Sequence, residues 1–470
     1  MKWLLGISLF FALPQVLPAS GFQCSQPVVF LEDDGAYVLL NVSWENSWHN
    51  ERNHDAVWLF FKRIHRAGGY QHIPILADGH EVVAIHSGDD LDLKIDVPED
   101  GVGFYVYPAS PYRGKVSAAL KIKVMPGVFA ERGRDYRALA AYGIEMVYIP
   151  EGPFYLGSAE TLAEEHNGFY HPDAEGGNGG VLQITNEQQS LRIAPDGDLY
   201  YRDENGYAGD QAGELAAEFP KGVDAYYIMK YEPTEGQYCH FLNCLDSIQR
   251  QDFEIHREEN YYEQGGAIRW TEQGYVSDYP HKPCQFMGWD DAMAMADWAG
   301  LRPMTELEFT KAARGPDRPQ GVDFPWGTTE KMQIQRWPDE NGELHMLNGW
   351  KESQLNETSR ALYGASYYWV MDLSGSLWER LVSVGHPLGR AFTGQHGDGI
   401  VDRLGGLNDP SWPQEGEGAG GFGFRGGGFY GYDRSYHDFN PFSPVAYRPY
   451  GGWPGGIRNN AYGTRFVRSK

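Results

Sequence analysis

The sequence predicts a β-sandwich-like domain followed by a larger region with few regular elements. Two observations lead to this fold class. Short runs of alternating apolar and polar residues recur between residues 25 and 125, and evenly spaced short strands are typical of a sandwich. From Gly143 onward, strand-like runs are sparse while Gly, Trp and Tyr are dense, which favours turns, irregular backbone and only a few short helices.

The strands of the first part are expected in five β-rich runs separated by polar turns: 36–44, 56–64, 91–97, 102–109 and 117–124. They define an accessory β-sandwich-like domain over residues 22–125. Trp44, Trp48 and Trp58 fall in or beside these runs. A sugar-binding platform and core packing are the two interpretations of these rings, and core packing is favoured. A linker, residues 126–142, is expected to follow.

The clearest helical pair of the second part lies at residues 289–315. Its first helix is expected to end near Ala299, because Gly300 is a stop signal. The second helix is expected to begin at Thr305, where Glu308, three residues on, completes a capping box. Neither helix carries catalytic spacing by itself.

The N-terminus predicts a secretory signal peptide, residues 1–20. Lys2 precedes an apolar run, Trp3–Leu13, and small residues follow near Ala19, in the order of a charged start, an apolar centre and a cleavage site. The run is too short to span a bilayer comfortably, and no later stretch offers about 18 consecutive apolar residues. We therefore expect an exported, soluble protein that is periplasmic, cell-surface or extracellular, with no membrane span.

The composition excludes several classes of partner and site. The formal net charge of −25 is scattered along the chain, and such a surface repels nucleic acids and anionic membranes. No CxxC, HExxH or Cys/His cluster indicates zinc, and no G-x-S-x-G elbow indicates a serine nucleophile. The cysteines of this 470-residue chain are too few for a disulfide framework: Cys24, Cys239, Cys244 and Cys284.

Seven segments of the second part carry a recognisable order: "IEMVYIPEGPFYLGS" (144–158), "YYIMKYEPTEGQYCHFLN" (226–243), "LRPMTELEFTKAARG" (301–315), "FPWG" (324–327), "VMDLSGSLWE" (370–379), "FRGGGF" (424–429) and "YGTRFVRS" (462–469). This order resembles that of the formylglycine-generating enzyme, or sulfatase-modifying factor, family. Single motifs of this kind are weak, but their colinearity is specific. Residues 143–470 are therefore identified as a domain of that family.

The resemblance implies a compact α+β architecture, related to C-type lectin domains, with little regular secondary structure. It also implies structural roles for six residues: Gly463, Arg465 and Phe466 in a C-terminal strand, Trp378 in the core, and Arg302 and Glu306 between the helices and the loops.

The resemblance does not extend to the family's oxidase chemistry. Oxidases of the family bind copper(I) through two cysteines between the "RGG" segment and the final strand, and they convert a substrate cysteine into formylglycine. Copper(I) requires soft thiolate ligands, and the corresponding window here, Gly427–Tyr462, contains no cysteine. We therefore expect no copper and assign no catalytic residues.

A second branch of the family, the sulfoxide synthases, holds iron with an HxxxH-x-E motif on N-terminal helices. The N-terminal part of this chain is β-rich, and its histidines lack that spacing: His49, His54, His65 and His72. This branch is therefore disfavoured.

Structural calcium is the cofactor that the resemblance does suggest. Carboxylate and carbonyl oxygens suit this ion, and family members use a "GNVWEW"-like motif whose counterpart here has a serine in place of the asparagine. The candidate ligands are Glu379, Ser376, Asn348 and Gly349. The alternative is that Glu379 pairs with an arginine such as Arg380 or Arg425.

The segment that follows "RGG" is the candidate binding surface, because it mixes rigid aromatic rings with short polar side chains, as antibody loops do. Aromatic rings also suit sugars. The alternative is an aromatic loop that packs on itself and covers the core. The candidate residues are Tyr430, Tyr432, Asp433, Tyr436, His437, Asp438, Asn440, Tyr447, Tyr450, Trp453, Asn459 and Asn460.

The favoured function is an exported, non-catalytic binding or structural protein whose partner is a protein or glycan at the cell surface. A sharper variant is a ligand-binding protein diversified by a retroelement, since the variable residues of such proteins lie in the same window. A third hypothesis is self-assembly into a larger envelope or appendage complex. A formylglycine-generating oxidase, or another enzyme of this family, is the least favoured alternative.

Overall fold

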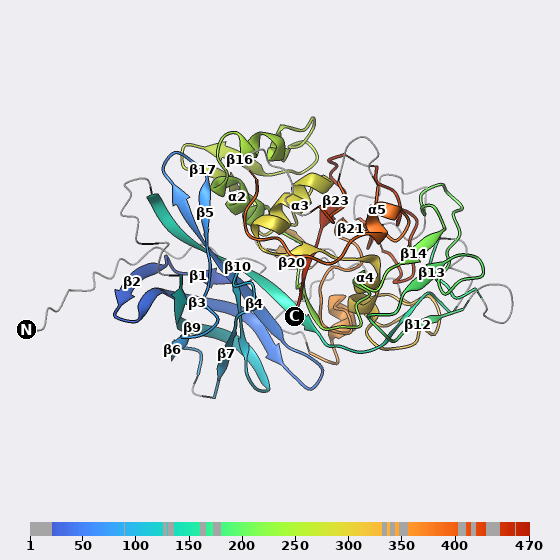
Figure 1. The fold of residues 1–470 in the computed structure, drawn as a ribbon, viewed down its shortest axis with the longest axis horizontal. Coiled ribbons are helices and arrows are strands. Elements are labelled where there is room, and N and C mark those ends of the chain that lie inside the picture. Colours follow the sequence, from blue (N-terminus) through green and yellow to red (C-terminus); the bar gives the residue numbers. More distant parts are fainter. Residues whose placement is uncertain are drawn as a thin grey trace, which may run out of the picture.

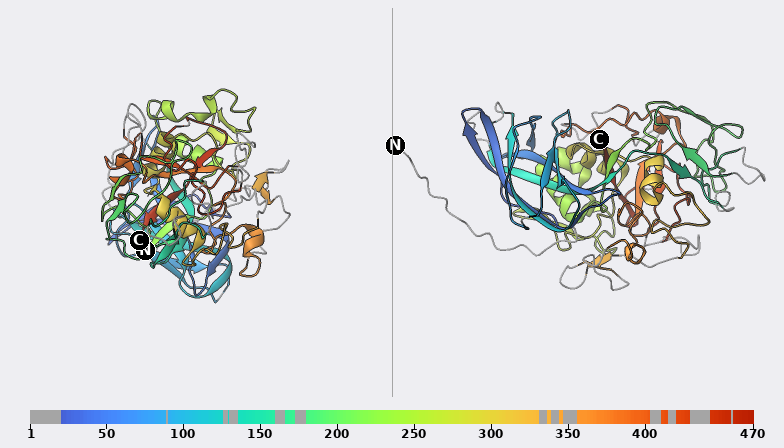
Figure 2. Two further views of the ribbon diagram at one scale, coloured as in Figure 1. Left: turned by 90° about the vertical axis from the view of Figure 1, so that its right-hand side faces the viewer. Right: turned by 90° about the horizontal axis from the view of Figure 1, so that it is seen from below.

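A computed structural model describes residues 21–88, 90–125, 129, 136–159, 166–172, 180–330, 336–338, 344–346, 356–402, 410–414, 420–428, 442–455 and 457–470. The expected signal peptide lies outside these residues. A β-sandwich forms one end of an elongated molecule, and the helices and short hairpins form the rest (Figures 1 and 2). None of the helices in the described residues has the length and apolar character needed to cross a membrane.

The first layer of the sandwich is a sheet whose strands all come from the N-terminal part: β1 (Gln23–Cys24), β2 (Val28–Glu32), β3 (Gly35–His49), β6 (Glu81–Ile85) and β9 (Tyr112–Val124). The longest pairing joins β3 to β9, from Ala36 opposite Val124 to His49 opposite Tyr112. The alternating apolar residues of these strands produce one buried face, as their sequence pattern predicts.

The second layer is an eight-stranded sheet that extends through the whole molecule: β18 (Arg302–Pro303), β24 (Phe466–Ser469), β15 (Tyr226–Met229), β10 (Tyr136–Ile149), β4 (Asp55–His65), β8 (Phe104–Pro108) and β7 (Leu93–Asp96), with β5 (Tyr70–Ile73) also paired to β4. The strands β4, β5, β7 and β8 come from the N-terminal part, whereas β15, β18 and β24 come from the C-terminal part. Strand β10 lies between the two groups and pairs with both (Figure 1).

Strand β10 corrects the expected linker. Residues 126–142 were assigned to a connection, but the strand begins at Tyr136 and pairs with β4 from Tyr136 opposite His65 to Val147 opposite Asp55. The physical reason is that β4 is a buried strand whose backbone groups need partners on both edges. Strand β8 covers one edge, so an alanine-rich segment is drawn into the sheet at the other.

Strand β4 also separates two hydrophobic cores. Val57, Leu59 and Phe61 point into the core between the two layers of the sandwich. The alternate residues, including Trp58 and Phe60, point into the core formed with the helices. Because side chains alternate across a strand, a single strand contributes to both cores and couples the two parts.

The three N-terminal tryptophans are core residues, which confirms the favoured interpretation. Trp44, Trp48 and Trp58 are all buried, and each belongs to a different hydrophobic cluster. Each indole nitrogen also donates a hydrogen bond: Trp44 to Asp55, Trp48 to Asn53 and Trp58 to the carbonyl of Ala299. None of the three rings is available to a sugar.

The helices are short and follow local signals: α2 (Glu235–Cys244), α3 (Trp289–Trp298), α4 (Glu306–Arg314) and α5 (Pro387–Arg390), with 3-10 helices η2 (Gln249–Phe253), η3 (Ile255–Arg257) and η5 (Arg360–Tyr363). The helix α3 ends before Ala299, and Gly300 has a positive φ of 67°. The helix α4 begins after Thr305, whose capping box with Glu308 is formed. These boundaries confirm those predicted for the pair.

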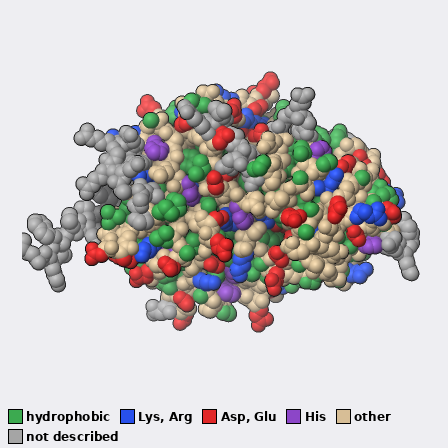
Figure 3. All heavy atoms as spheres, viewed as in Figure 1, with side chains coloured by type: hydrophobic (Ala, Val, Ile, Leu, Met, Phe, Trp, Pro, Cys, Tyr) green, Lys and Arg blue, Asp and Glu red, His purple; other side chains and the backbone are tan. Residues whose placement is uncertain are grey.

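The remaining described strands form small sheets: β11 (Phe154–Leu156) with β12 (Leu182–Ile184), β13 (Leu191–Ile193) with β14 (Gly213–Leu215), β16 (Ile268–Thr271) with β17 (Gly274–Ser277), β19 (Arg336–Pro338) with β20 (Leu344–Met346), and β21 (Trp378–Val382) between β22 (Phe422–Arg425) and β23 (Tyr462–Thr464). The predicted α+β character is thus strand-rich. Acidic and basic side chains are interspersed over the face shown in Figure 3.

Candidate functional site

The predicted binding segment is only partly described. Seven of its candidate residues lie outside the described residues: Tyr430, Tyr432, Asp433, Tyr436, His437, Asp438 and Asn440. Asn348 and Gly349, two of the proposed calcium ligands, also lie outside them. The rest of the segment, from residue 442 onward, returns to the three-stranded sheet and can be placed.

Three aromatic residues of the described segment pack on the small sheet. Tyr447 is fully buried, with its ring 4.9 Å from that of His166, and it belongs to a cluster with Trp378. Tyr450 and Trp453 are half-buried, and the Tyr450 ring lies 5.3 Å from Trp378. For Tyr447 the structure supports the alternative of a self-packed loop, whereas the other two rings keep partly exposed edges.

The two asparagines shape the turn into β23. The side chain of Asn459 accepts a hydrogen bond from the backbone N–H of Ala461 (2.9 Å), and its carbonyl accepts one from Phe286 (2.9 Å). The side-chain oxygen of Asn460 is buried and has no hydrogen-bond partner among the described residues. Asn459 therefore fixes the backbone, as short polar side chains do in turns.

A buried ion-pair network lies beneath this segment. The carboxylate of Glu306 accepts hydrogen bonds from Arg448 at 2.6 and 3.0 Å, although the two residues are 142 positions apart. Arg302 and Glu308 form a second buried pair with two N–O distances of 2.6 and 2.9 Å. The predicted role of Arg302 and Glu306 in tying helices to loops is confirmed. Arg448 completes the network from the loop side.

Glu379 is engaged by an arginine, but not by either of those considered from the sequence. Its Oε1 accepts hydrogen bonds from Nε and Nη2 of Arg465 at 3.0 and 2.6 Å, and both residues are fully buried. Burial raises the pKa of Glu379, and the charge of Arg465 opposes that shift. Trp378 and Phe466 are buried as predicted. The site around Glu379 therefore favours a structural ion pair.

Calcium stays a prediction for this chain. Ser376 is buried next to Glu379 and has a positive φ of 59°, but no group of three or more His, Cys, Asp or Glu side chains in the described ranges is arranged to hold a metal ion. Of the described residues in the proposed ligand set, Glu379 thus fits the Arg465 ion pair better than a calcium site.

The four cysteines lie outside the window in which the family's oxidases carry their copper ligands. All four are free thiols, and Cys239, Cys244 and Cys284 are buried. Burial raises the pKa of Cys24 and Cys244 to about 11, and it raises the pKa of Cys239 and Cys284 as well. The thiolate is the form of cysteine that binds metals and reacts as a nucleophile. These environments therefore disfavour both metal binding and nucleophilic reactivity of the cysteines.

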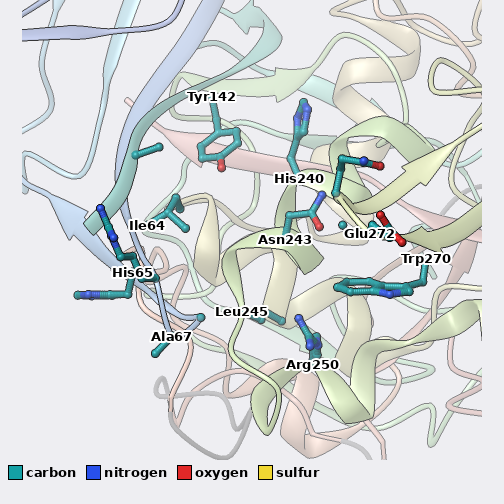
Figure 4. A pocket seen from close by; sticks show the side chains of 15 residues that line it. Ile64, His65, Ala67, Tyr142, His240, Asn243, Leu245, Arg250, Trp270 and Glu272 are labelled. Carbon is teal, nitrogen blue, oxygen red and sulfur yellow. The ribbon is translucent and has the colours of Figure 1, made fainter. Parts of the chain in front are cut away.

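An open pocket of about 480 Å³ is the second candidate site (Figure 4). It lies where the N-terminal sandwich meets the helices. Its lining comes from the end of β4 and the following turn, from β10, from α2, from η2 and from the β16–β17 hairpin. Trp270, Glu272 and Arg250 line the side of the helices, and Ile64 and Tyr142 line the side of the sandwich.

This pocket is not predictable from the sequence pattern alone. The hairpin carries a usable signal, because "IRWT" and "GYVS" alternate on either side of a short polar turn. An exposed Trp270 is not visible in that pattern, however. The hairpin lies near the turn after β4, which is about 200 positions earlier in the chain. Only the fold determines that these two segments meet.

Comparison with known proteins gives a consistent family assignment. The sequence model of the sulfatase-modifying factor enzyme 1-like domain matches residues 180–470. The formylglycine-generating enzyme of Thermomonospora curvata is 44% identical over 111 residues, which are 22% of this chain and 34% of that protein. The hercynine oxygenase of Mycobacterium tuberculosis is 40% identical over 138 residues, or 26% and 32%.

A third relative is the formylglycine-generating enzyme of Streptomyces coelicolor, which is 29% identical over 106 residues, or 22% of this chain and 33% of that protein. The chain therefore spans about a third of the length of these curated relatives. The similarity is therefore local and covers only part of each enzyme.

Proposed function

Because the chain belongs to the family of sulfatase-modifying factor enzyme 1-like domains, we propose that it is an exported, non-catalytic member that binds a protein or glycan partner. The partner contacts the segment after "RGG". The observation that carries this proposal is the cysteine-free window Gly427–Tyr462. Copper(I) chemistry needs soft thiolate ligands, and oxygen or nitrogen side chains are poor substitutes for them.

The positions of the existing thiols support the same proposal. Cys239 and Cys244 belong to α2, and Cys284 precedes α3, so all three lie outside the window between β22 and β23 in the sequence. Their burial raises the pKa of each thiol, so a copper-binding thiolate pair is disfavoured there too.

The similarity to a hercynine oxygenase does not alter the proposal. The matched part is 26% of this chain, and the N-terminal described residues form a β-sandwich. One of the histidines there, His54, stacks on Tyr107 and Tyr148 with centroid distances of 4.3 and 4.9 Å. This arrangement supports a packing role for the histidine.

A direct assay tests the non-catalytic part of the proposal. The purified protein is incubated with copper and a peptide that carries the cysteine motif of sulfatases, and conversion of the cysteine to formylglycine is followed by mass spectrometry. We expect no conversion, because no thiolate pair occupies the copper position. The Thermomonospora curvata enzyme is the positive control, and turnover by this chain would contradict the proposal.

The binding part is tested by the same preparation on arrays of proteins and glycans. The variant changes Tyr430, Tyr432 and Tyr436 to Ala, because replacing all of 429–460 would remove Tyr447 and Arg448, which are buried. We expect the array signal of the unchanged protein to fall in this variant. Tyr279→Ala, at a tyrosine of another segment with 36% exposure, is the control. An unchanged signal would remove the segment from the proposal.

A further inference from the structure

We propose that the pocket between the sandwich and the helices binds a sugar ring of a neutral glycan, with Trp270 as the stacking platform. This site is separate from the C-terminal segment, and it does not depend on that segment's function. Its volume of about 480 Å³ lies in the range of pockets for small ligands. A protein partner would require a much larger contact area.

Trp270 is the central feature of the pocket. It is 53% exposed, although tryptophan is highly buried on average. Its ring meets Tyr275 edge-on at 4.9 Å, and the Arg250 guanidinium lies 5.2 Å from its centroid. The indole is thus held by Tyr275 and by a guanidinium over its ring, and the part of its surface that stays exposed is a flat apolar surface, which suits the C–H face of a sugar.

Two charged side chains accompany this platform, and both are available. Arg250 and Glu272 line the pocket, and neither side chain forms a hydrogen bond or ion pair with any residue that the structure describes. In Figure 4 they lie on opposite sides of Trp270. Many other arginines of the chain are paired with carboxylates, for example Arg448 with Glu306. Glu272 is exposed, whereas Arg250 is half-buried with its guanidinium 5.2 Å from the Trp270 ring centroid, and both side chains can contact a ligand in the pocket.

The pair also selects the class of ligand. Arginine only donates hydrogen bonds and an ionised glutamate only accepts them. A sugar hydroxyl does both, so it can satisfy either residue. An anionic ligand would meet the carboxylate of Glu272, and a cationic ligand would meet the guanidinium of Arg250. A neutral polyhydroxylated ring avoids both conflicts.

The hairpin that carries Trp270 is held rigidly in place. The side-chain amide of Asn243, on α2, donates to the carbonyl of Tyr275 (2.9 Å) and accepts from its N–H (2.8 Å). Gly274 has a positive φ of 122°, and a Cβ there would lie 2.4 Å from the Asn243 Oδ1. The turn therefore requires glycine. A platform that is ordered before binding loses little entropy when the ligand arrives.

The opposite wall comes from the N-terminal part. Ile64 and His65, at the end of β4, and Tyr142, on β10, face the hairpin across the pocket (Figure 4). The Tyr142 hydroxyl lies 3.2 Å from the Cys244 Sγ on α2. The pocket therefore exists only because β10 joins the two parts, and neither part alone would form both walls.

A glycan array with the full-length mature protein tests the proposal. We expect signal on neutral glycans, and binding of the best hexasaccharide measured by calorimetry should weaken by about tenfold or more in Trp270→Ala. Trp270→Phe should retain part of the affinity, because it keeps a ring. Tyr262→Ala is the matched control, since Tyr262 is 57% exposed and lies outside the pocket.

The charged pair gives a second readout. Arg250→Ala and Glu272→Gln should each weaken binding several-fold, and binding to a neutral sugar should change little between low and high salt. No signal on any neutral glycan, or equal affinity in Trp270→Ala, would overturn the proposal. Binding to acidic glycans alone would overturn it too. Neutral-glycan binding that persists in the Tyr430, Tyr432 and Tyr436 variant, while other array signals fall, would separate this site from the C-terminal segment.

Discussion

At the scale of single residues, Lys62 is the most unusual buried group. It lies on β4 with no exposed surface. Its ammonium donates to the carbonyls of Trp298 (2.6 Å) and Gly399 (2.5 Å) and lies 2.9 Å from Nδ1 of His72. Burial is the largest influence on this lysine and lowers its pKa to about 7. The hydrogen bonds thus offset only part of the desolvation of the charge.

The pKa of Lys62 predicts a specific dependence of stability on pH. Between the folded pKa of about 7 and the ordinary value of 10.5, the unfolded chain binds more protons than the folded chain, so the free energy of unfolding should rise with pH. The contribution is up to about 1.4 kcal/mol per pH unit. Lys62→Met should reduce this rise, and Lys311, whose pKa burial lowers to about 8, should contribute to what remains.

Urea denaturation at about pH 7.5 and about pH 9.5 measures the effect, because both values lie inside that window. Lys94→Met is the control, since the side chain of Lys94 is 55% exposed. An equal pH dependence in the unchanged protein and in Lys62→Met would contradict the assignment. Titration of the neighbouring His72 cannot cause the rise in this pH window, because burial lowers the pKa of His72 far below it.

At the scale of elements, helix caps illustrate what local sequence can specify. Both α2 and α4 begin with a threonine capping box, formed by Thr234 with Gln237 and by Thr305 with Glu308. The hydroxyl of Thr305 has an additional role, because it also donates to the carbonyl of Pro220 at 2.9 Å. One cap is local, whereas the other also joins its helix to a distant loop.

This difference predicts unequal effects of the same substitution. Thr234→Ala should lower the free energy of unfolding by about 1 kcal/mol, which is typical of a lost N-cap. Thr305→Ala should lower it by about 2 kcal/mol, because the partly buried carbonyl of Pro220 also loses its hydrogen bond. Urea denaturation measures both, and Thr305→Ser should restore most of the loss. A smaller effect at Thr305 than at Thr234 would show that the Pro220 contact contributes nothing.

At the scale of the whole molecule, the continuous sheet makes the two parts one structural unit. Trp58, on β4, donates to the carbonyl of Ala299 at the end of α3 and lies under the Arg468 guanidinium, 4.5 Å from its ring centroid. Arg468 belongs to the C-terminal strand β24 and forms an ion pair with Asp100 of the sandwich. Segments from the beginning, middle and end of the chain thus meet at one side chain.

This arrangement predicts a single cooperative unfolding transition. In Trp58→Ala the loss of a large buried ring should lower the free energy of unfolding by about 3–5 kcal/mol, and calorimetry should show that the whole transition moves to lower temperature. Trp270→Ala, at an exposed ring, should change stability by only about 0.5 kcal/mol. Two resolved transitions, of which only one responds to Trp58→Ala, would contradict the prediction.

The sequence alone determined the features that rest on neighbouring residues. Alternation identified the strands 36–44 and 56–64, and Gly300 and the Thr305–Glu308 pair located the helix ends within one residue. The order of seven motifs identified the family, and the window Gly427–Tyr462 contains no cysteine. Each of these signals depends on neighbouring residues, on the order of motifs or on the absence of a residue type, so it can be recognised without knowledge of the fold.

Only the tertiary structure decided the features that join distant positions. The partner of Glu379 is Arg465, 86 residues away, rather than the adjacent Arg380. The expected linker became strand β10, and the pocket beside Trp270 formed between segments about 200 positions apart. The physical reason is that buried backbone groups and charges need partners that are close in space. Many residues in the sequence have the right chemistry to be such a partner, and only the packing of the sheet and the cores determines which of them is close enough.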